Sequence, residues 1–239
     1  MSVLIFWINL NDSSNRLTFM NNQFKHFNID NYRINAVTPT DFDSKKYHIK
    51  SHVSNMKRYK TTMKEIACMA SHLIAFKQGM DLNNHMFCVC EDDISFTKNV
   101  SNEYLDALIQ DAPPDWEILQ LSFLCLNNTT LRKVLSSKSK WIKWIPNVHY
   151  GTAFYIIKTH VAKRLLNTYY NTNVFDFSMV NARIQADYLI YKDAVCYTLT
   201  KPISTIETSL NSTIHPQHMF QQIQCNNIIK SYVDSSSKF

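Results

Sequence analysis

The sequence has 239 residues, of which 45% are hydrophobic and 18% are charged. These proportions are ordinary for a folded protein and exclude a chain that is disordered throughout. Only two glycines occur, which excludes the glycine-rich loops that hold phosphates in dinucleotide-binding and P-loop proteins. The net charge of +6 is spread along the chain without a basic arm. Nucleic acid is therefore not an expected partner.

The cysteines and the N-terminal segment bear on the cellular compartment. None of the six cysteines falls in a CxxC pair, and most lie in apolar runs, so we expect free thiols in a reducing compartment. Residues 1–10 are apolar but lack a basic start and are too short to span a membrane. We expect a cytoplasmic protein without a transmembrane segment. The abundance of Asn, Lys and Ile is typical of AT-rich genomes, so a virus-encoded protein acting in a host cell is one expectation.

Strands and helices are expected to alternate along the chain. Residues 3–8 form an apolar run typical of a strand covered on both faces. The polar segment 39–60 is expected to be a long loop over a site. Thr62 and Glu65 form a capping box that begins the clearest helix, and Gly79 is expected to end it. The other expected elements are strands at 32–37, 86–90, 117–122, 153–157 and 195–199, and helices at 16–27, 159–170 and 176–191.

This alternation predicts an α/β fold with a central, mostly parallel sheet flanked by helices. One domain is expected over residues 1–234, with a frayed tail at 235–239. The segment 127–146 is expected to be an excursion from the sheet. Ligands bind beyond the C-terminal ends of the strands in such sheets. Two expected strand ends carry unusual polar residues, namely Asn9 and the triplet 91–93.

The triplet Glu91-Asp92-Asp93 follows directly after a buried strand. Adjacent carboxylates repel one another, and desolvation at a strand end adds to the cost. A divalent cation such as Mn²⁺ or Mg²⁺ relieves that repulsion, because hard cations prefer oxygen ligands. Glu91 and Asp93 lie on the same side if the strand continues, so they can share a metal, or one can bind the metal while the other meets a ribose. A solvent-exposed turn that caps a helix is the alternative.

Several short motifs follow one another in a fixed order. They are Ile8-Asn9-Leu10 with Arg16, Ala36-Val37, Glu65-Ile66-Ala67-Cys68 with Ser71-His72, Glu91-Asp92-Asp93, Trp116-Glu117 with Leu121, Gly151-Thr152-Ala153 with Tyr155, and Ala186-Asp187-Tyr188-Leu189. In this order the chain resembles glycosyltransferase family 25, which contains bacterial lipooligosaccharide and collagen hydroxylysine galactosyltransferases. The resemblance covers residues from about 3 to 215. Lys64 departs from it, because the family usually has glycine before the glutamate of the helix motif.

The resemblance implies a GT-A-type single domain, a UDP-sugar donor carrying galactose or glucose, Mn²⁺ dependence and inversion at the sugar. The acceptor would be a glycan or a hydroxylated protein. Arg16 would pair with a phosphate. The residues implied to bind the donor are Asn9, Leu10, Arg16, Ser71, His72, Glu91, Asp92 and Gly151. The implied metal ligands are Glu91, Asp93 and His215, with a surface position as the alternative for His215.

Asp187 is the candidate general base, which inversion requires opposite the leaving diphosphate. It is expected in an otherwise apolar helix, where an unpaired acid is costly. An exposed helix position is the alternative. Two other classes of function compete with a glycosyltransferase. A metal-dependent phosphotransferase or nuclease also gathers carboxylates, and a catalytically inert sugar-binding relative would retain the same fold.

Overall fold

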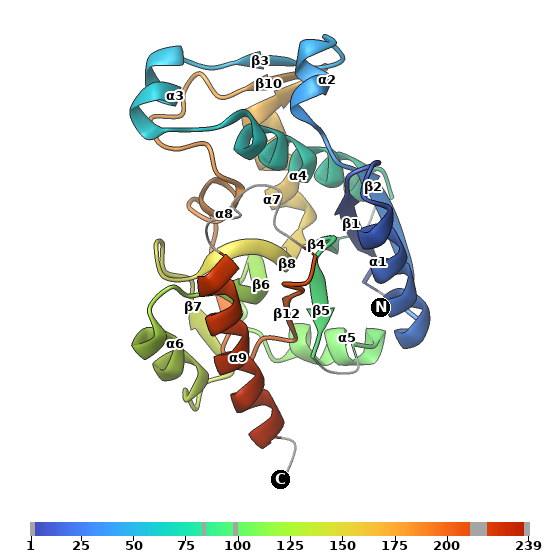
Figure 1. Ribbon diagram of the computed structural model, residues 1–239, viewed down its shortest axis with the longest axis vertical. Coiled ribbons are helices and arrows are strands. Elements are labelled where there is room, and N and C mark those ends of the chain that lie inside the picture. Colours follow the sequence, from blue (N-terminus) through green and yellow to red (C-terminus); the bar gives the residue numbers. More distant parts are fainter. Residues whose placement is uncertain (1–2, 83–84, 98–99, 211–218, 237–239) are drawn as a thin grey trace.

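The computed structural model describes residues 3–82, 85–97, 100–210 and 219–236. At its centre is a seven-stranded sheet with the order β2-β1-β4-β8-β6-β11-β7 (Figure 1). The strands are β1 (Ile5–Asn9), β2 (Asn31–Asn35), β4 (Met86–Glu91), β6 (Ile118–Leu124), β7 (Trp141–Lys143), β8 (Tyr150–Lys158) and β11 (Cys196–Leu199). All run in one direction except β8 and β7, which run opposite. The predicted α/β fold with a mostly parallel central sheet is confirmed.

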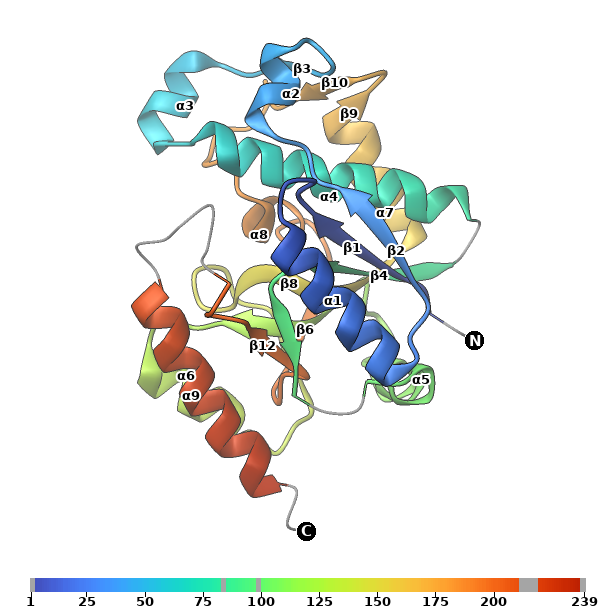
Figure 2. The same ribbon diagram turned by 45° about the vertical axis from the view of Figure 1, so that its right-hand side comes forward.

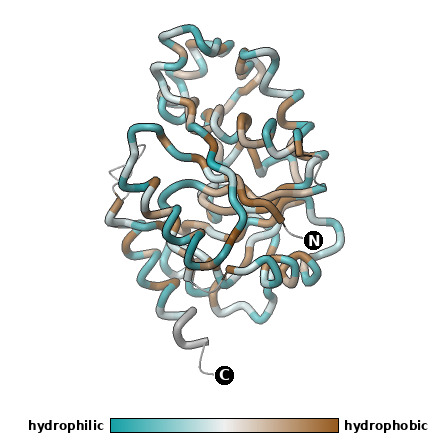
Figure 3. The backbone as a smooth tube through the Cα atoms, turned by 90° about the vertical axis from the view of Figure 1, so that its right-hand side faces the viewer, coloured by the Kyte–Doolittle hydropathy of each residue, from teal (hydrophilic) through white to brown (hydrophobic). Residues whose placement is uncertain are grey.

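Helices cover both faces of this sheet. One face carries α4 (Met63–Asp81), α7 (Thr159–Tyr169) and α8 (Ala186–Leu189), and the other carries α1 (Ser14–Phe27) and α5 (Asn102–Gln110). Successive side chains of a strand point to opposite faces. In β1, Phe6 and Ile8 therefore pack with α4, while Ile5 and Trp7 pack with α1. Figure 2 shows α1 and α4 on either side of β1, and Figure 3 shows apolar chain concentrated in the central strands.

The segment 39–60 is not the loop that the sequence predicts. It contains α2 (Pro39–Asp43), β3 (His48–Lys50) and α3 (Val53–Tyr59), which lie at the top of Figure 1. Strand β3 pairs with β10 (Val174–Asp176), which also pairs with β9 (Tyr170–Asn171). The polar composition of this segment favours a loop, but it includes a capping box that begins α2. In this capping box, Thr38 and Asp41 satisfy the first backbone donors of the helix. The pairing of β3 depends on residues far along the chain.

Two other expectations are wrong in part. The segment 127–146 contains α6 (Asn128–Leu135) and also β7, which pairs with β11 at the edge of the central sheet. The helix expected at 176–191 is reduced to the four residues of α8. Its first half is diverted because the Ser178 N–H and hydroxyl both donate to Asp176 Oδ1, at 3.0 and 2.6 Å. Such local side-chain bonds compete with helix formation.

A two-stranded sheet and the C-terminal helix complete the fold, and the helix lies in the lower part of Figure 1. Strand β5 (Ile94–Phe96) pairs with β12 (Ser204–Ile206), and α9 (Met219–Ser236) packs on α6 through a small apolar cluster. Part of the expected frayed tail, residues 235–236, belongs to α9, and the rest lies outside the described residues. Each of the six cysteines is a free thiol, as predicted. Within the described ranges, every helix is too short or too polar to cross a membrane.

Gly79 does not end its helix, because α4 continues to Asp81. A Cβ atom at this position would lie 2.7 Å from the ring of Phe87, which is fully buried in β4. Glycine is therefore required by the close approach of α4 to the sheet, and not by a helix terminus.

Replacing Gly79 with alanine should destabilise the protein. Alanine favours a helix by about 1 kcal/mol over glycine, but forcing apart a packed core costs about 1–3 kcal/mol. We expect a net loss in the free energy of unfolding, measured by urea denaturation. The same substitution in a Phe87→Leu background should cost less, because the ring is gone. Equal losses in both backgrounds would contradict this packing.

Candidate active site

The acidic motif lies at the C-terminal edge of the central sheet. Glu91 is the last residue of β4, and Asp92 and Asp93 form the turn that leads into β5. Asn9 ends the neighbouring strand β1, and its side-chain amide donates to Asp92 Oδ2 at 2.6 Å. The two polar strand ends that stand out in the sequence therefore meet at one place.

Arg16 is the partner of the two aspartates. Its Nη1 forms a short ion pair with Asp92 Oδ1 and lies 3.2 Å from Asp93 Oδ2. Its Nη2 donates to the carbonyl oxygen of Leu210 at 2.7 Å. Arg16 is 8% exposed, so this guanidinium is held inside the acidic motif. The structure places it against carboxylates, where the resemblance implies a contact with phosphate.

Glu91 has different partners. Its Oε1 accepts a hydrogen bond from the Thr152 hydroxyl at 2.7 Å and lies 3.5 Å from His72 Nε2. Burial alone would raise the pKa of Glu91, but His72, Thr152 and Arg16 outweigh it and hold the pKa below its usual value. Glu91 is therefore ionised at neutral pH.

Asp93 is a carboxylate of the motif whose pKa is raised. Burial and the neighbouring charge of Glu91 raise its pKa to about 7, although Arg16 acts in the opposite direction. Its Oδ1 is buried and has no hydrogen-bond partner among the described residues. A buried carboxylate oxygen without a partner, beside a second ionised carboxylate, is a donor set that suits a hard divalent cation. The residues present therefore fit the metal that the family implies.

Helix α4 supplies the other wall of the site. Thr62 and Glu65 form the predicted capping box at its start, and Glu65 Oε1 also binds Arg183 Nη2 at 2.7 Å. The Ser71 hydroxyl accepts from the Val37 N–H at 2.8 Å and donates to the carbonyl oxygen of Ala67. Ser71 thus fixes the segment after β2 against α4.

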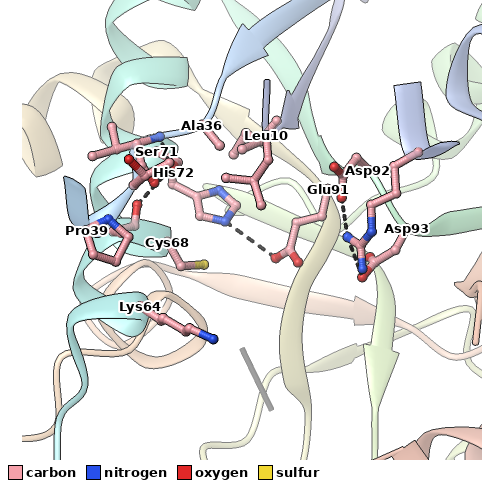
Figure 4. Close-up of a pocket in the computed structure, with 15 residues that line it drawn as sticks. Leu10, Ala36, Pro39, Lys64, Cys68, Ser71, His72, Glu91, Asp92 and Asp93 are labelled. Atoms are coloured by element: carbon pink, nitrogen blue, oxygen red, sulfur yellow. Dashed lines mark hydrogen bonds and ion pairs between the residues drawn. The ribbon is translucent and has the colours of Figure 1, made fainter. Parts of the chain in front are cut away.

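Two cavities meet at the acidic motif. The first has a volume of about 180 Å³ and lies between the ends of β1, β2 and α4 (Figure 4). The second has a volume of about 450 Å³ and lies between α4, β8 and α8. Cys68, Glu91 and Asp93 line both cavities. Molecules bound in the two cavities would therefore both contact the carboxylates of Glu91 and Asp93.

Asp187 lines the second cavity from the first turn of α8. It is not in a long apolar helix, and its side chain is half-buried beside the backbone of Gly151. Burial raises the pKa of Asp187 to about 6, the hydrogen bond from Gly151 lowers it, and the charge of Glu91 raises it. Gly151 has a φ of +96°, which favours glycine because it has no Cβ.

The structure gathers most of the expected site residues around the two cavities. Leu10, Arg16, Ser71, His72 and Asp92 line the first, Gly151 and Asp187 line the second, and Glu91 and Asp93 line both. Asn9 supports the motif through Asp92. His215 lies outside the described residues.

Several residues in contact with these were not singled out by the sequence. Thr152 and Tyr155 stand in motifs that match the family, but nothing in the sequence shows that they touch Glu91 and His72. Arg183 has no local signal, because its partner Glu65 is distant in the chain.

Comparison with known proteins shows the class of protein to which this chain belongs. Residues 3–190 match the family described as glycosyltransferase family 25 (LPS biosynthesis protein), so the chain is of the glycosyltransferase class. It belongs to glycosyltransferase family 25, as the order of its motifs predicts. No match is found among the curated proteins. One solved structure that it resembles is that of a glycosyltransferase involved in the glycosylation of the major capsid of PBCV-1. The two share 9% identity over 92% of this chain and 100% of that chain, with a TM-score of 0.39.

Asp93→Asn should stabilise the metal-free protein at alkaline pH. Because the pKa of Asp93 is raised in the folded state, the folded protein binds more protons than the unfolded one between about pH 4 and 7. Stability should therefore fall as pH rises through that range, by an amount on the order of a few kcal/mol. The neutral variant should escape this fall and melt several degrees higher at pH 8, in a thermal melt.

The exposed residue Asp12 offers a matched control. Asp12→Asn should leave the pH dependence of the melting temperature as in the wild type. Mn²⁺ should stabilise the wild type and the control, but not Asp93→Asn. A wild-type melting temperature that does not change between pH 5 and 8 would contradict the assigned burial of this charge.

Proposed function

We propose that the protein transfers a hexose from a UDP-sugar to a hydroxyl group of a glycan or protein acceptor, with inversion and with the help of Mn²⁺ or Mg²⁺. The observation that carries the proposal is the buried Asp93 Oδ1, which has no partner among the described residues and stands at the wall between two cavities. Membership of a glycosyltransferase family supports it.

The first cavity suits the nucleotide. Leu10, Ala36, Val37 and Pro39 give it an apolar side, and the carboxylates lie at its other side (Figure 4). An apolar pocket with a few polar groups at one end is typical of sites that bind a base and a charged tail. Lys64, which departs from the glycine usual in the family, lines the same cavity and brings a positive charge toward the diphosphate.

Glu91 and Asp93 would hold the cation. Its chemistry would be to neutralise the charge that grows on the diphosphate as the sugar leaves. Arg16 fixes Asp92 and Asp93 through ion pairs and offsets part of their charge. We therefore assign Arg16 to the orientation of the motif, in place of the phosphate contact that the resemblance implies.

Asp187 would activate the acceptor from the second cavity. A carboxylate with a pKa near 6 is mostly ionised at neutral pH and is still basic enough to take a proton. The acceptor oxygen would form a bond to the anomeric carbon while the bond from that carbon to the diphosphate breaks. The hydroxyl proton would pass to Asp187, and UDP would leave on the side of the first cavity.

The acceptor side has room beyond one sugar ring. A third cavity of about 260 Å³ shares Tyr150, Arg183 and Asp187 with the second and adds Trp144 and Tyr188. Aromatic side chains next to polar groups are typical of carbohydrate sites, because sugar rings have an apolar face. This supports a glycan acceptor, and it gives Trp144 a place in the site, although that residue also packs on Tyr191.

The direct test is the release of UDP from UDP-galactose and UDP-glucose. We expect slow, metal-dependent UDP release even without acceptor, and UDP with Mn²⁺ should raise the melting temperature because a bound ligand stabilises the folded state. Cleavage of oligonucleotides without UDP release would indicate a nuclease. Neither activity, together with no thermal shift, would indicate an inert relative.

Asp187→Asn should lower transfer about 10²- to 10⁴-fold, as expected for the loss of a general base. The thermal shift with UDP and Mn²⁺ should persist, because Asp187 does not line the first cavity. In the wild type, kcat/KM should rise as pH increases through about 6, where Asp187 loses its proton.

Asp193 provides the matched control, since it is an exposed aspartate six residues away that pairs with Lys192. Asp193→Asn should leave both the rate and the pH profile unchanged. Full transfer activity in Asp187→Asn would remove Asp187 from the reaction.

A further inference from the structure

A second cluster of possible ligands adjoins the acidic motif. Cys68 Sγ, a ring nitrogen of His72 and a carboxylate oxygen of Glu91 all lie within 4.8 Å of one another. Cys68 and His72 are four residues apart on α4 and therefore share one face of the helix. Glu91 comes from the end of β4, opposite that face. Figure 4 shows the three side chains turned toward a common space.

His72 presents a ring nitrogen to this space, and Glu91 is its ion-pair partner there when the ring is protonated. The residue is fully buried, and its Nε2 has no hydrogen-bond partner among the described residues. The Glu91 Oε1 atom, at 3.5 Å, is too far for a well-formed hydrogen bond. A buried polar atom left without a hydrogen bond destabilises the folded state. A ligand placed between Nε2 and Oε1 would remove that cost.

The surrounding contacts orient both groups toward the space. His72 Nδ1 lies 2.9 Å from the Tyr155 hydroxyl, and if Nδ1 carries the proton, Nε2 presents a lone pair. The Thr152 hydroxyl donates to Glu91 Oε1 at 2.7 Å. Histidines that bind metals usually donate their other N–H to a neighbouring group in this way.

The donor atoms differ from those that a hard cation prefers. A thiolate, an imidazole and a carboxylate are ligands for Zn²⁺, whereas Mn²⁺ and Mg²⁺ favour sets of oxygens. Ligand atoms of a tetrahedral zinc site lie about 3.3–3.6 Å apart, and His72 Nε2 and Glu91 Oε1 are already 3.5 Å apart. Cys68 and Glu91 also line both cavities, so a fourth position is open to water.

We propose that Cys68, His72 and Glu91 bind a divalent cation of the zinc type, at a site that shares Glu91 with the proposed hard-cation site but does not use Asp93. Binding would form a bond from the Cys68 sulfur to the metal and release the thiol proton to solvent, without any change of oxidation state. Burial raises the pKa of the Cys68 thiol, so uptake of the cation must displace that proton. This site does not depend on the identity of the sugar donor.

Cobalt is the probe, because Co²⁺ takes zinc sites and a thiolate bound to it absorbs in the near ultraviolet. The whole protein is stripped with a chelator and titrated with Co²⁺. We expect one equivalent to bind with a thiolate charge-transfer band and the visible bands of a tetrahedral site. Cys68→Ser should lose the charge-transfer band and bind Co²⁺ at least about tenfold more weakly.

Two control variants separate this site from others. Cys125→Ser removes a cysteine that packs under α6 and α9, and it should retain the band. Asp93→Asn disables the proposed hard-cation site and should also retain the band. A cooperative thermal melt of Cys68→Ser without ligand shows that the variant is folded.

Two outcomes would overturn the proposal. One is a wild-type protein that gives no thiolate band, and the other is a band that survives in Cys68→Ser. In either case, a thermal shift with UDP and Mn²⁺ would leave the proposed glycosyl transfer intact. Loss of that shift in the wild type, with the cobalt band retained, would instead reject the proposed transfer and keep the zinc-type site.

Discussion

The structure depends on excess negative charge held at the end of β4. Three carboxylates are gathered there, and Arg16 is the cation that pairs with two of them. Asn9 and Thr152, from the neighbouring strands, each donate a hydrogen bond to the motif, so β1 and β8 are both positioned around it. Asp93 still keeps one oxygen without a partner among the described residues. The folded motif therefore carries excess negative charge, which a bound cation can neutralise.

Sequence predicts those parts of the fold that local patterns determine. The buried strand β1, the capping box of α4 and the polar strand ends all follow from neighbouring residues, and the structure confirms them. The pairings of β3 with β10 and of β7 with β11 join segments that no local pattern connects. The helix predicted at 176–191 is wrong for a local reason. Asp176 and Ser178 form a hydrogen-bonded turn that outweighs the helical periodicity. The single-domain boundary remains a prediction.

The candidate site, like the fold, can be predicted from the sequence only in part. The acidic triplet and the motif residues of α4 can be found from the sequence. The sequence does not show which charged side chains pair with one another. The resemblance implies a phosphate contact for Arg16, but Arg16 pairs with Asp92 and Asp93, because α1 begins at the edge of the sheet where β1 ends and packs beside β5. Cys68 stands in one of the family motifs, but nothing in the sequence shows that it borders both cavities. Pairing of charges across the sheet is a property of the assembled fold, so composition and spacing cannot give it.

The two sides of the proposed reaction are linked through Glu91. Its charge raises the pKa of both Asp93 and Asp187, which both line the second cavity. A cation bound at Glu91 would oppose that effect, because a nearby positive charge favours the ionised form of a carboxylate. Arrival of the donor with its cation would therefore lower the pKa of Asp187 and leave the base ionised.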